Sequence, residues 1–457
     1  MNIILILLSL FFGAVFLLYA TNKEKQAVAI VVSRVFIAIV FLYSGFVKAV
    51  DPLGYTYKII DYFTAFGMDN FKALAFYLSI AITSAEFLIG FGLLFGVFLR
   101  LYSILAALFM IVFTPLTLYL AINNPVTDCG CFGDALVITN WQTFWKNLII
   151  DIPLIILLLQ KRNLKDSFSS QNAIVLNIGG LVFILVISIY SFMHLPIIDF
   201  RPYKIGNNIK EGMKIPEGEK TDVYKSTFTY RNIKTQEEKD FTEDNLDEPL
   251  NNEELWEFVD SKTILLEEGY HPPIHDFNIV SKTNGDITEQ VLNDSAYTFI
   301  LVSYNLNKAN FDGLIKFEQL SRAVSNAKFM ALTAALDDEI EKNQDSLIHY
   351  FSYDTIVKKE LSTQTIYFYE YEGNVMEFSE DEIPEDEAYL FIGTEDIEEE
   401  STQKAKLSFE FNICDPTTLK TIVRANPGMI LIKNGVIIDK WHYSDFPAQE
   451  EIQKIIN

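Results

Sequence analysis

Cysteine is scarce in this sequence, with three among 457 residues. Three cysteines cannot cross-link a disulfide-dense scaffold, which excludes the class of small secreted domains that depend on many disulfides. They allow one working pair and one residue left over.

An excess of positive charge is also missing, because the formal net charge is −24. Residues 1–199 hold 11 Lys+Arg and 10 Asp+Glu, so the remainder holds 36 − 11 = 25 basic and 60 − 10 = 50 acidic residues. Such an acidic C-terminal half repels phosphates and anionic headgroups, which excludes nucleic acid and anionic lipid headgroups as its partners.

Basic residues are absent before the first apolar run, which only Met1 and Asn2 precede. A secretory signal peptide carries a positively charged segment at this place, so we expect the first run to be retained as a membrane span.

Long apolar runs are what the first half has in abundance. Each is long enough to cross about 30 Å of hydrocarbon at about 1.5 Å per residue. Lysine and arginine in alternate loops place the N-terminus outside, and with it residues 123–141 and everything after His194. The six predicted spans are 3–20, 28–50, 73–98, 101–122, 142–160 and 173–194.

Charged residues within these spans include Arg34, Lys48, Glu86 and Asp151. Helical rise places Arg34 and Glu86 at similar depths, so they are predicted to form an ion pair, unless Arg34 snorkels toward the interface. Asp151 precedes Ile152-Pro153 and would either relay protons or satisfy backbone groups near Pro153. Lys48 ends the second span, level with residues 123–141.

The loop Asp128-Cys129-Gly130-Cys131-Phe132-Gly133-Asp134 holds two of the three cysteines. Cysteines at i and i+2 have α-carbons within about 7 Å, so they pair only if Gly130 bends. A disulfide in so small a ring is strained and easily reduced, which indicates an exchange site rather than a staple. Asp128 and Asp134 would disfavour the reactive thiolate, and Lys48 would favour it if close.

Two other interpretations of this loop stay open. The cysteines could be inert residues of a structural loop. Alternatively, Cys129 and Cys131 with His194 would suit Zn or Cu(I), although no fourth ligand is evident and no metal is expected.

Three segments carry a resemblance: RVFIAIVFLYSGFVKAVDPLG (34–54), AEFLIGFGLLFG (85–96) and DCGCFGD (128–134). Together they resemble the DoxX/MauE family of redox-associated membrane proteins over roughly residues 28–160. The resemblance implies a four-helix core. It also implies a role for Cys129 and Cys131 in disulfide formation or thiol-linked quinone reduction, with a quinone as the implied cofactor.

The second half alternates strands and helices. Residues 222–232 and 235–242 are predicted to form a hairpin in a small β-rich region, and 274–280 to begin a domain of buried strands and amphipathic helices. This alternation is typical of an α/β fold with a mixed sheet. The predicted domains are 1–26 (first span and turn), 27–195 (DoxX/MauE-like bundle), 196–272 (linker and β-rich region) and 273–457 (α/β domain).

Residues 273–457 resemble the thioredoxin fold. Pro427, after Asn426, occupies the place of that fold's cis-proline, directly before a core strand. The expected CxxC is absent, because residues 305–310 read NLNKAN. The resemblance therefore implies a domain that binds a partner near Asn426 and Pro427 without exchanging disulfides itself. Cys414 precedes a predicted helix, whose dipole would lower its pKa, or it is an inert, half-buried residue.

The prediction is a multi-pass protein of the bacterial inner (cytoplasmic) membrane, an all-α transmembrane bundle with an α/β thioredoxin-like domain in the periplasm. Cys129 and Cys131 would pass electrons between an extracytoplasmic thiol protein or client peptide and a quinone, as a thiol:quinone oxidoreductase. The competing hypothesis is a non-catalytic membrane-anchored assembly or scaffold factor.

Overall fold

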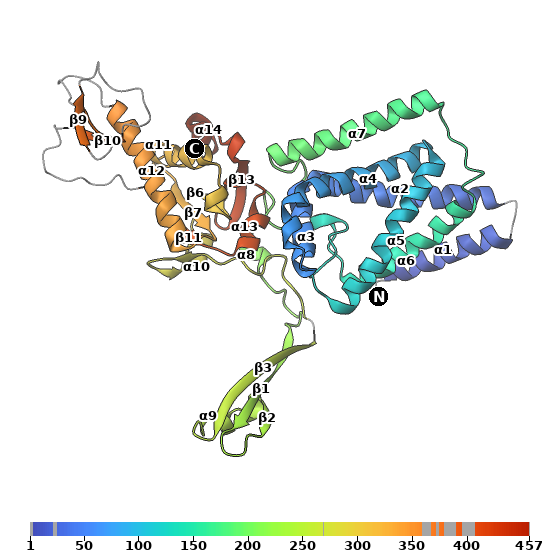
Figure 1. The fold of residues 1–457 in the computed structure, drawn as a ribbon, viewed down its shortest axis with the longest axis horizontal. Coiled ribbons are helices and arrows are strands. Elements are labelled where there is room, and N and C mark those ends of the chain that lie inside the picture. The colour runs from blue at the N-terminus through green and yellow to red at the C-terminus, as the bar shows by residue number, and fades with distance from the viewer. Residues whose placement is uncertain are drawn as a thin grey trace.

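The computed structural model describes residues 3–21, 25–267, 269–358, 367–371, 374–378, 390–394 and 407–456. A helical bundle and an α/β domain lie side by side, and a narrow three-stranded arm projects away from both (Figure 1). The predicted multidomain organisation, helical first and mixed α/β afterwards, is confirmed.

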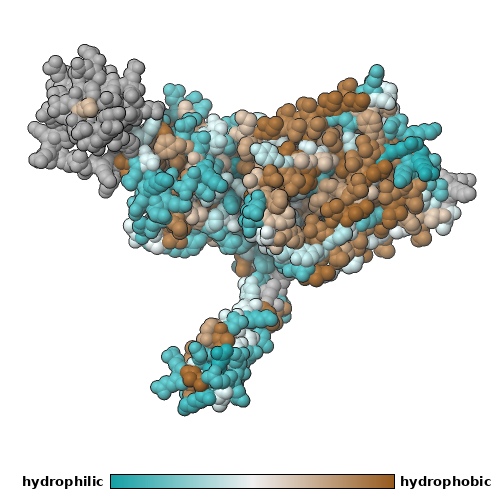
Figure 2. All heavy atoms as spheres, in the orientation of Figure 1, coloured by the Kyte–Doolittle hydropathy of each residue, from teal (hydrophilic) through white to brown (hydrophobic). Residues whose placement is uncertain are grey.

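Five helices of the described chain are long and apolar enough to cross a membrane. The first predicted span, 3–20, corresponds to α1 (Ile3–Thr21), an apolar helix whose stretch Ile6–Thr21 is shorter than the other five, so its crossing stays a prediction. Apolar side chains dominate the visible surface of the bundle, whereas the C-terminal domain is largely hydrophilic (Figure 2). The five helices are α2 (Gln26–Val50), α4 (Ala75–Phe95, after a 3-10 helix at Asp69–Leu74), α5 (Leu99–Asn123), α6 (Asn140–Leu159) and α7 (Ser170–Met193).

Two glycines let α2 and α4 approach closely. A Cβ on Gly45 would lie 2.6 Å from the backbone nitrogen of Phe87, and one on Gly90 would lie 2.4 Å from that of Leu42. Real side chains cannot fit there, so both positions require glycine. These two contacts fix the register of the antiparallel pair and decide which residues of the two helices face each other.

One end of the bundle is built from α3 (Pro52–Ala65) and the cysteine loop. Asp51 caps α3 by accepting a hydrogen bond from the Gly54 amide at 2.9 Å. The base of the loop is closed by Asn140, whose side-chain amide donates to Asn124 Oδ1 at 2.7 Å. Thr139 and Gln142 form a capping box at the start of α6.

The C-terminal domain is a seven-stranded mixed sheet with helices packed on it. The strand order is β13-β12-β6-β7-β11-β4-β5; β6 and β7 are parallel, and β12 is antiparallel to both β6 and β13. Apolar clusters cover both faces of the central strands. The strands are β4 (Val280–Ser281), β5 (Gly285–Asp286), β6 (Thr298–Ser303), β7 (Lys328–Thr333), β11 (Phe411–Ile413), β12 (Gly428–Lys433) and β13 (Val436–His442). The helices are α8 (Ile209–Gly212), α10 (Thr288–Leu292), α11 (Phe311–Ala323), α12 (Asp337–Lys358), α13 (Pro416–Ile422) and α14 (Gln449–Ile456).

Two small sheets complete the fold. The predicted hairpin is present as β1 (Val223–Asn232) and β2 (Glu238–Thr242), and β3 (Trp256–Glu267) pairs with β1 to form the arm. The other sheet joins β8 (Tyr367–Tyr371), β9 (Asn374–Phe378) and β10 (Leu390–Thr394); between β2 and β3 lies α9 (Asp247–Leu250). The strand predicted over 274–280 is wrong except at its end, because residues 274–279 bury their apolar side chains without joining a ladder.

Candidate functional site

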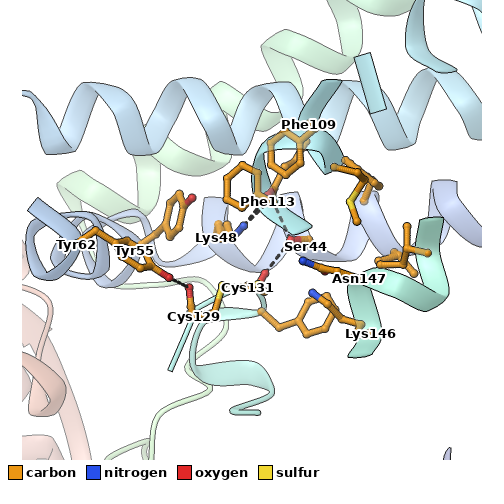
Figure 3. A pocket seen from close by; sticks show the side chains of 16 residues that line it. Ser44, Lys48, Tyr55, Tyr62, Phe109, Phe113, Cys129, Cys131, Lys146 and Asn147 are labelled. Carbon is orange, nitrogen blue, oxygen red and sulfur yellow. Dashed lines mark hydrogen bonds and ion pairs between the residues drawn. The ribbon is translucent and has the colours of Figure 1, made fainter. Parts of the chain in front are cut away.

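The two loop cysteines are held side by side at one end of the bundle. Their sulfur atoms lie 2.8 Å apart, and Gly130 between them has a φ of +65°. That left-handed conformation is open to glycine at little cost, which is why the chain can fold back between the two cysteines. Cys129 is buried and Cys131 is half-buried, and both side chains face a cavity inside the bundle (Figure 3).

The loop backbone is tied to α2 and α3. The Tyr62 hydroxyl donates to the Cys129 carbonyl at 2.8 Å, and the Ser44 hydroxyl donates to the Cys131 carbonyl at 2.7 Å. Ser44 also contacts Glu86 Oε2 at 2.9 Å, so the loop is linked directly to a charged group of α4. These bonds fix the position of both cysteines over the bundle.

Glu86 forms its ion pair with Lys48. The Lys48 ammonium lies 2.7 and 2.8 Å from the two carboxylate oxygens, and both side chains are buried. The predicted Arg34–Glu86 pair is therefore wrong. The proximity expected between Lys48 and the cysteine loop is present, since Lys48 and Cys131 line one cavity.

The register of α2 and α4 explains this error. The depth estimate assumed that span 28–50 begins at the inner face of the membrane and span 73–98 at the outer face, whereas the Gly45–Phe87 contact places the last turns of α2 opposite Glu86. Arg34 instead lies at the other end of the pair, with Nη1 3.6 Å from the place of a Cβ on Gly96. Its Nε is buried and has no hydrogen-bond partner in the described part of the chain.

The loop aspartates are neutralised by cations. Lys58 lies 2.6 Å from Asp128, which also accepts a hydrogen bond from the Gly130 amide at 2.8 Å. Arg424 of the C-terminal domain lies 2.9 Å from Asp134. Because each carboxylate has a cationic partner, the expected opposition of the aspartates to a thiolate is weakened.

The pKa values of the two thiols are shifted in opposite directions. A hydrogen bond from Cys129 to Cys131 lowers the pKa of Cys131 to about 6 against the opposing effect of burial, and the positive charges of Lys146 and Lys48 lower it further. The same hydrogen bond, with burial, raises the pKa of Cys129 well above its ordinary value. Cys131 is therefore the sulfur that is ionised near neutral pH, and the ionised form is the nucleophile.

Two cavities meet beneath the loop. The dithiol pocket is lined by both cysteines together with Ser44, Lys48, Tyr55, Tyr62, Glu86, Phe109, Phe113, Lys146 and Asn147 among others (Figure 3). The lateral pocket lies among α1, α2, α6 and residues 132–138 and is apolar except for Gln142 and Lys146. Both pockets share Val40, Phe132, Lys146 and Ile150, so Lys146 stands at their junction.

Asp151 lies apart from the cysteines. Its carboxylate accepts a hydrogen bond from the Thr114 hydroxyl at 3.1 Å, and it does not line the dithiol pocket. One turn earlier on α6, Asn147 does line that pocket and donates to Thr117 at 3.1 Å. The structure thus places Asp151 near α5, with a hydroxyl rather than a backbone group as its partner.

Asn426 and Pro427 form a cis peptide bond at the edge of β12. The Asn426 side chain accepts a hydrogen bond from the Ser303 hydroxyl at 2.8 Å and donates one to the Asn305 carbonyl at 2.7 Å. These bonds connect the segment before Pro427 with the segment after β6 where a CxxC was expected. Neither residue lines the two pockets beneath the cysteine loop.

The structure does not support a reactive Cys414 or a metal site at Cys129, Cys131 and His194. Cys414 is buried in the C-terminal core, and burial raises its pKa to about 11; the alternative in which the helix dipole lowers the pKa is wrong, and the alternative of an inert cysteine is favoured. His194 pairs with Asp445 at 2.8 Å. Among the described residues, no three His, Cys, Asp or Glu side chains gather as metal ligands.

Residues of this site that sequence reasoning missed include Ser44, Lys58, Tyr62, Lys146 and Arg424. Lys146 carried a detectable signal, because burying a lysine within an apolar span costs free energy and such residues mark candidate functional sites. Arg424 carried none, since 290 residues separate it from Asp134.

The comparisons with known proteins place one part of the chain. Residues 25–160 match the model of a family described as methylamine utilisation protein MauE, which confirms the resemblance to MauE drawn from the sequence. No curated protein and no solved structure matches the chain. The family match and the five apolar helices identify a multi-pass membrane protein.

Proposed function

Taking the MauE-type membrane region over residues 25–160 as the premise, we propose that this protein is a membrane thiol–disulfide oxidoreductase. Cys129 and Cys131 cycle between dithiol and disulfide, giving electrons to an acceptor in the membrane and taking them from a thiol partner outside. The single observation that carries the proposal is the pair of adjacent sulfurs above a cation-lined cavity within the bundle.

Oxidation of the dithiol removes two electrons and two protons as one S–S bond forms. Cys131 supplies the thiolate because its thiol is the more acidic, and Cys129 joins it in the S–S bond as both thiol protons and the two electrons leave to the membrane acceptor. Lys146 and Lys48 stabilise the Cys131 thiolate, and Glu86 holds the Lys48 ammonium in place. A disulfide that includes only Gly130 between its cysteines is strained and easily reduced again.

The lateral pocket fits a membrane-soluble quinone as the acceptor. It is almost entirely apolar, as a ring with a hydrocarbon tail requires, and its two polar side chains, Gln142 and Lys146, are hydrogen-bond donors suited to a carbonyl oxygen. A bound quinone would supply two-electron acceptor chemistry. Lys146 would orient it, because the lysine reaches both the lateral and the dithiol pockets.

The C-terminal domain would receive the thiol partner. Its central strand order β13-β12-β6-β7, with β6 and β7 parallel, and the Asn426–Asn305 contact support a thioredoxin-like fold that retains a binding face without the thiols. With six spans, including α1, this domain and the cysteine loop would lie in the periplasm of a bacterium. From the family's description as a methylamine utilisation protein we infer only that this protein takes part in maturing an extracytoplasmic client protein.

The test is redox cycling of the full-length protein in quinone-containing liposomes. Reduced protein should re-form the Cys129–Cys131 disulfide, seen as the loss of two alkylated thiols by mass spectrometry. Cys129→Ser and Cys131→Ser should abolish this loss, whereas Cys414→Ser, the matched control, should leave it intact. Retention of both thiols in the wild-type protein would exclude the proposal.

A scaffold role is the competing proposal, favoured by the absence of thiols at 305–310 and the burial of Cys414. In that case, Cys129→Ser and Cys131→Ser would leave cellular function unchanged, and deletion of residues 216–457 would abolish it.

A further inference from the structure

Arg424 joins the C-terminal domain to the cysteine loop. Its Nε lies 2.8 and 3.0 Å from the two Asp51 oxygens, its Nη2 lies 2.9 Å from Asp134, and Nη1 donates to the Lys420 carbonyl. The side chain is 5% exposed. A single buried guanidinium thus holds the helix cap of α3 and the far end of the cysteine loop together.

The sulfurs face away from the side where this contact forms. Both cysteines line the dithiol pocket inside the bundle. A second cavity, the interdomain pocket, lies among α3, the loop and α13, and the loop contributes only Gly130, Gly133 and Asp134 to its lining. A partner thiol that arrives between the two domains therefore meets the loop backbone, with the sulfurs behind it.

The loop has two points at which it can turn. Gly130 and Gly133 have φ values of +65° and +51° and flank the Cys131-Phe132 segment. A Cβ on Gly133 would meet no atom within 4 Å, so the chain there is not confined by packing. Beyond Gly133, the Arg424–Asp134 pair fixes this end of the loop.

We propose that Arg424 is a latch: it holds the Cys131 sulfur toward the bundle, and its release from Asp134 lets the segment between Gly130 and Gly133 turn this sulfur toward a partner thiol outside. The inference rests on the proposed function, since a latch matters only if the sulfurs exchange with a partner. The C-terminal domain then acts as a gate that decides whether the dithiol faces the membrane acceptor or the partner, and Arg424 is a positioning residue.

An arginine suits this role better than a lysine. Its planar group points separate N–H donors at Asp51, Asp134 and the Lys420 carbonyl, and its positive charge lies 5.5 Å from the centre of the Tyr57 ring. A lysine ammonium can approach one carboxylate closely but lacks the fork that spans both. The latch should therefore be weakened by Arg424→Lys and lost in Arg424→Gln.

Asp134→Asn separates the latch from the attachment of the domain. It releases the loop while the Asp51–Arg424 pair remains. Asp61→Asn is the matched control, because Asp61 lines the same interdomain pocket and has no ion pair in the described part of the chain. Arg424→Gln tests the latch from the other side, and correct folding of Asp134→Asn keeps the test valid if Arg424→Gln misfolds.

The experiment measures access to the reduced thiols of the full-length Cys414→Ser protein in sealed liposomes. A membrane-impermeant maleimide is compared with a small membrane-permeant one, in reductant, so the result does not depend on redox cycling. Asp134→Asn and Arg424→Gln should raise the ratio of impermeant to permeant labelling by about tenfold, because both lose the charge-assisted hydrogen bond between Arg424 and the half-buried Asp134. Arg424→Lys should be intermediate, and Asp61→Asn unchanged.

An unchanged ratio in Asp134→Asn would overturn the latch and leave the proposed function standing. A raised ratio in protein whose thiols never cycle would reject the proposed function while the gate itself remained. An equal rise in Asp61→Asn would mean that any polar change in this pocket loosens the loop, which would also overturn the specific role of Arg424.

Discussion

Replacing Cys129 by Ala should shift the titration of Cys131. The hydrogen bond from Cys129 is the largest cause that brings the pKa of Cys131 from 9.0 to about 6. A thiol with a pKa of about 6 is about 90% ionised at pH 7, and one with a pKa of 9.0 about 1%. In Cys129→Ala, the midpoint of Cys131 reactivity should therefore rise from about 6 toward 9.0.

The midpoint is a better observable than the rate at one pH. The wild-type protein has about 90 times more thiolate at pH 7, but intrinsic nucleophilicity falls with the pKa at a Brønsted slope of about 0.4–0.5, which costs about 16- to 32-fold over this range. The two effects leave a rate difference of only about three- to sixfold. The pH profile, by contrast, moves by up to about three pH units.

The assay follows iodoacetamide labelling of Cys131 by mass spectrometry between pH 4.5 and 10, in reduced Cys414→Ser protein. Lys146→Met should raise the midpoint by less than Cys129→Ala, because the charge of Lys146 lowers the pKa of Cys131 by less than the hydrogen bond from Cys129 does. Lys165→Met, in the loop between α6 and α7, should change nothing. A wild-type midpoint near 9, or one that Cys129→Ala leaves in place, would refute the account of how Cys131 is activated.

Three further results are expected. Glu86→Gln or Lys48→Met should destabilise the bundle by about 3–5 kcal/mol in denaturant unfolding, because each single variant leaves a buried charge unpaired. The double variant Lys48→Met with Glu86→Leu should recover most of the lost stability. Equal losses in all three variants would contradict the role of the ion pair. Gly130→Ala should destabilise the loop by about 1–2 kcal/mol, seen as faster amide exchange over 128–134, because its φ is +65°; unchanged exchange would contradict it. Burial lowers the pKa of His442 from 6.5 to about 4, so the unfolded state binds a proton that the folded state does not, and stability of the C-terminal domain should fall as pH drops from 6.5 to 4. His442→Gln should reduce the difference in melting temperature between pH 4.5 and 7.5, and a full difference in this variant would exclude His442 as the cause.

Local patterns in the sequence predicted much of the fold. Asp415 caps α13 with Pro416 at the first helical position, as the residue types indicate, and the hairpin over 222–242 is formed as β1 and β2. Both features depend on residues close together in the chain. The cysteine loop was found the same way, because two cysteines and a glycine between apolar runs form a compact signal.

Contacts between distant segments were not predictable in the same way. The Lys48–Glu86 pair depends on how far α4 slides along α2, which Gly45 and Gly90 fix by close packing that hydropathy does not report. The ion pairs of Arg424 could not be predicted for the same reason, because its partners Asp51 and Asp134 lie on distant elements of the fold. Packing register, rather than helix assignment, was the missing information.

The most direct test of the account is the oxidation state of Cys129 and Cys131 in living cells. Acid-quenched cells are alkylated with a mass-tagged maleimide before and after depletion of quinone, in a Cys414→Ser background. The account predicts a mixture of disulfide and dithiol that shifts toward dithiol when quinone is depleted. Cysteines that stay fully reduced under both conditions would contradict it.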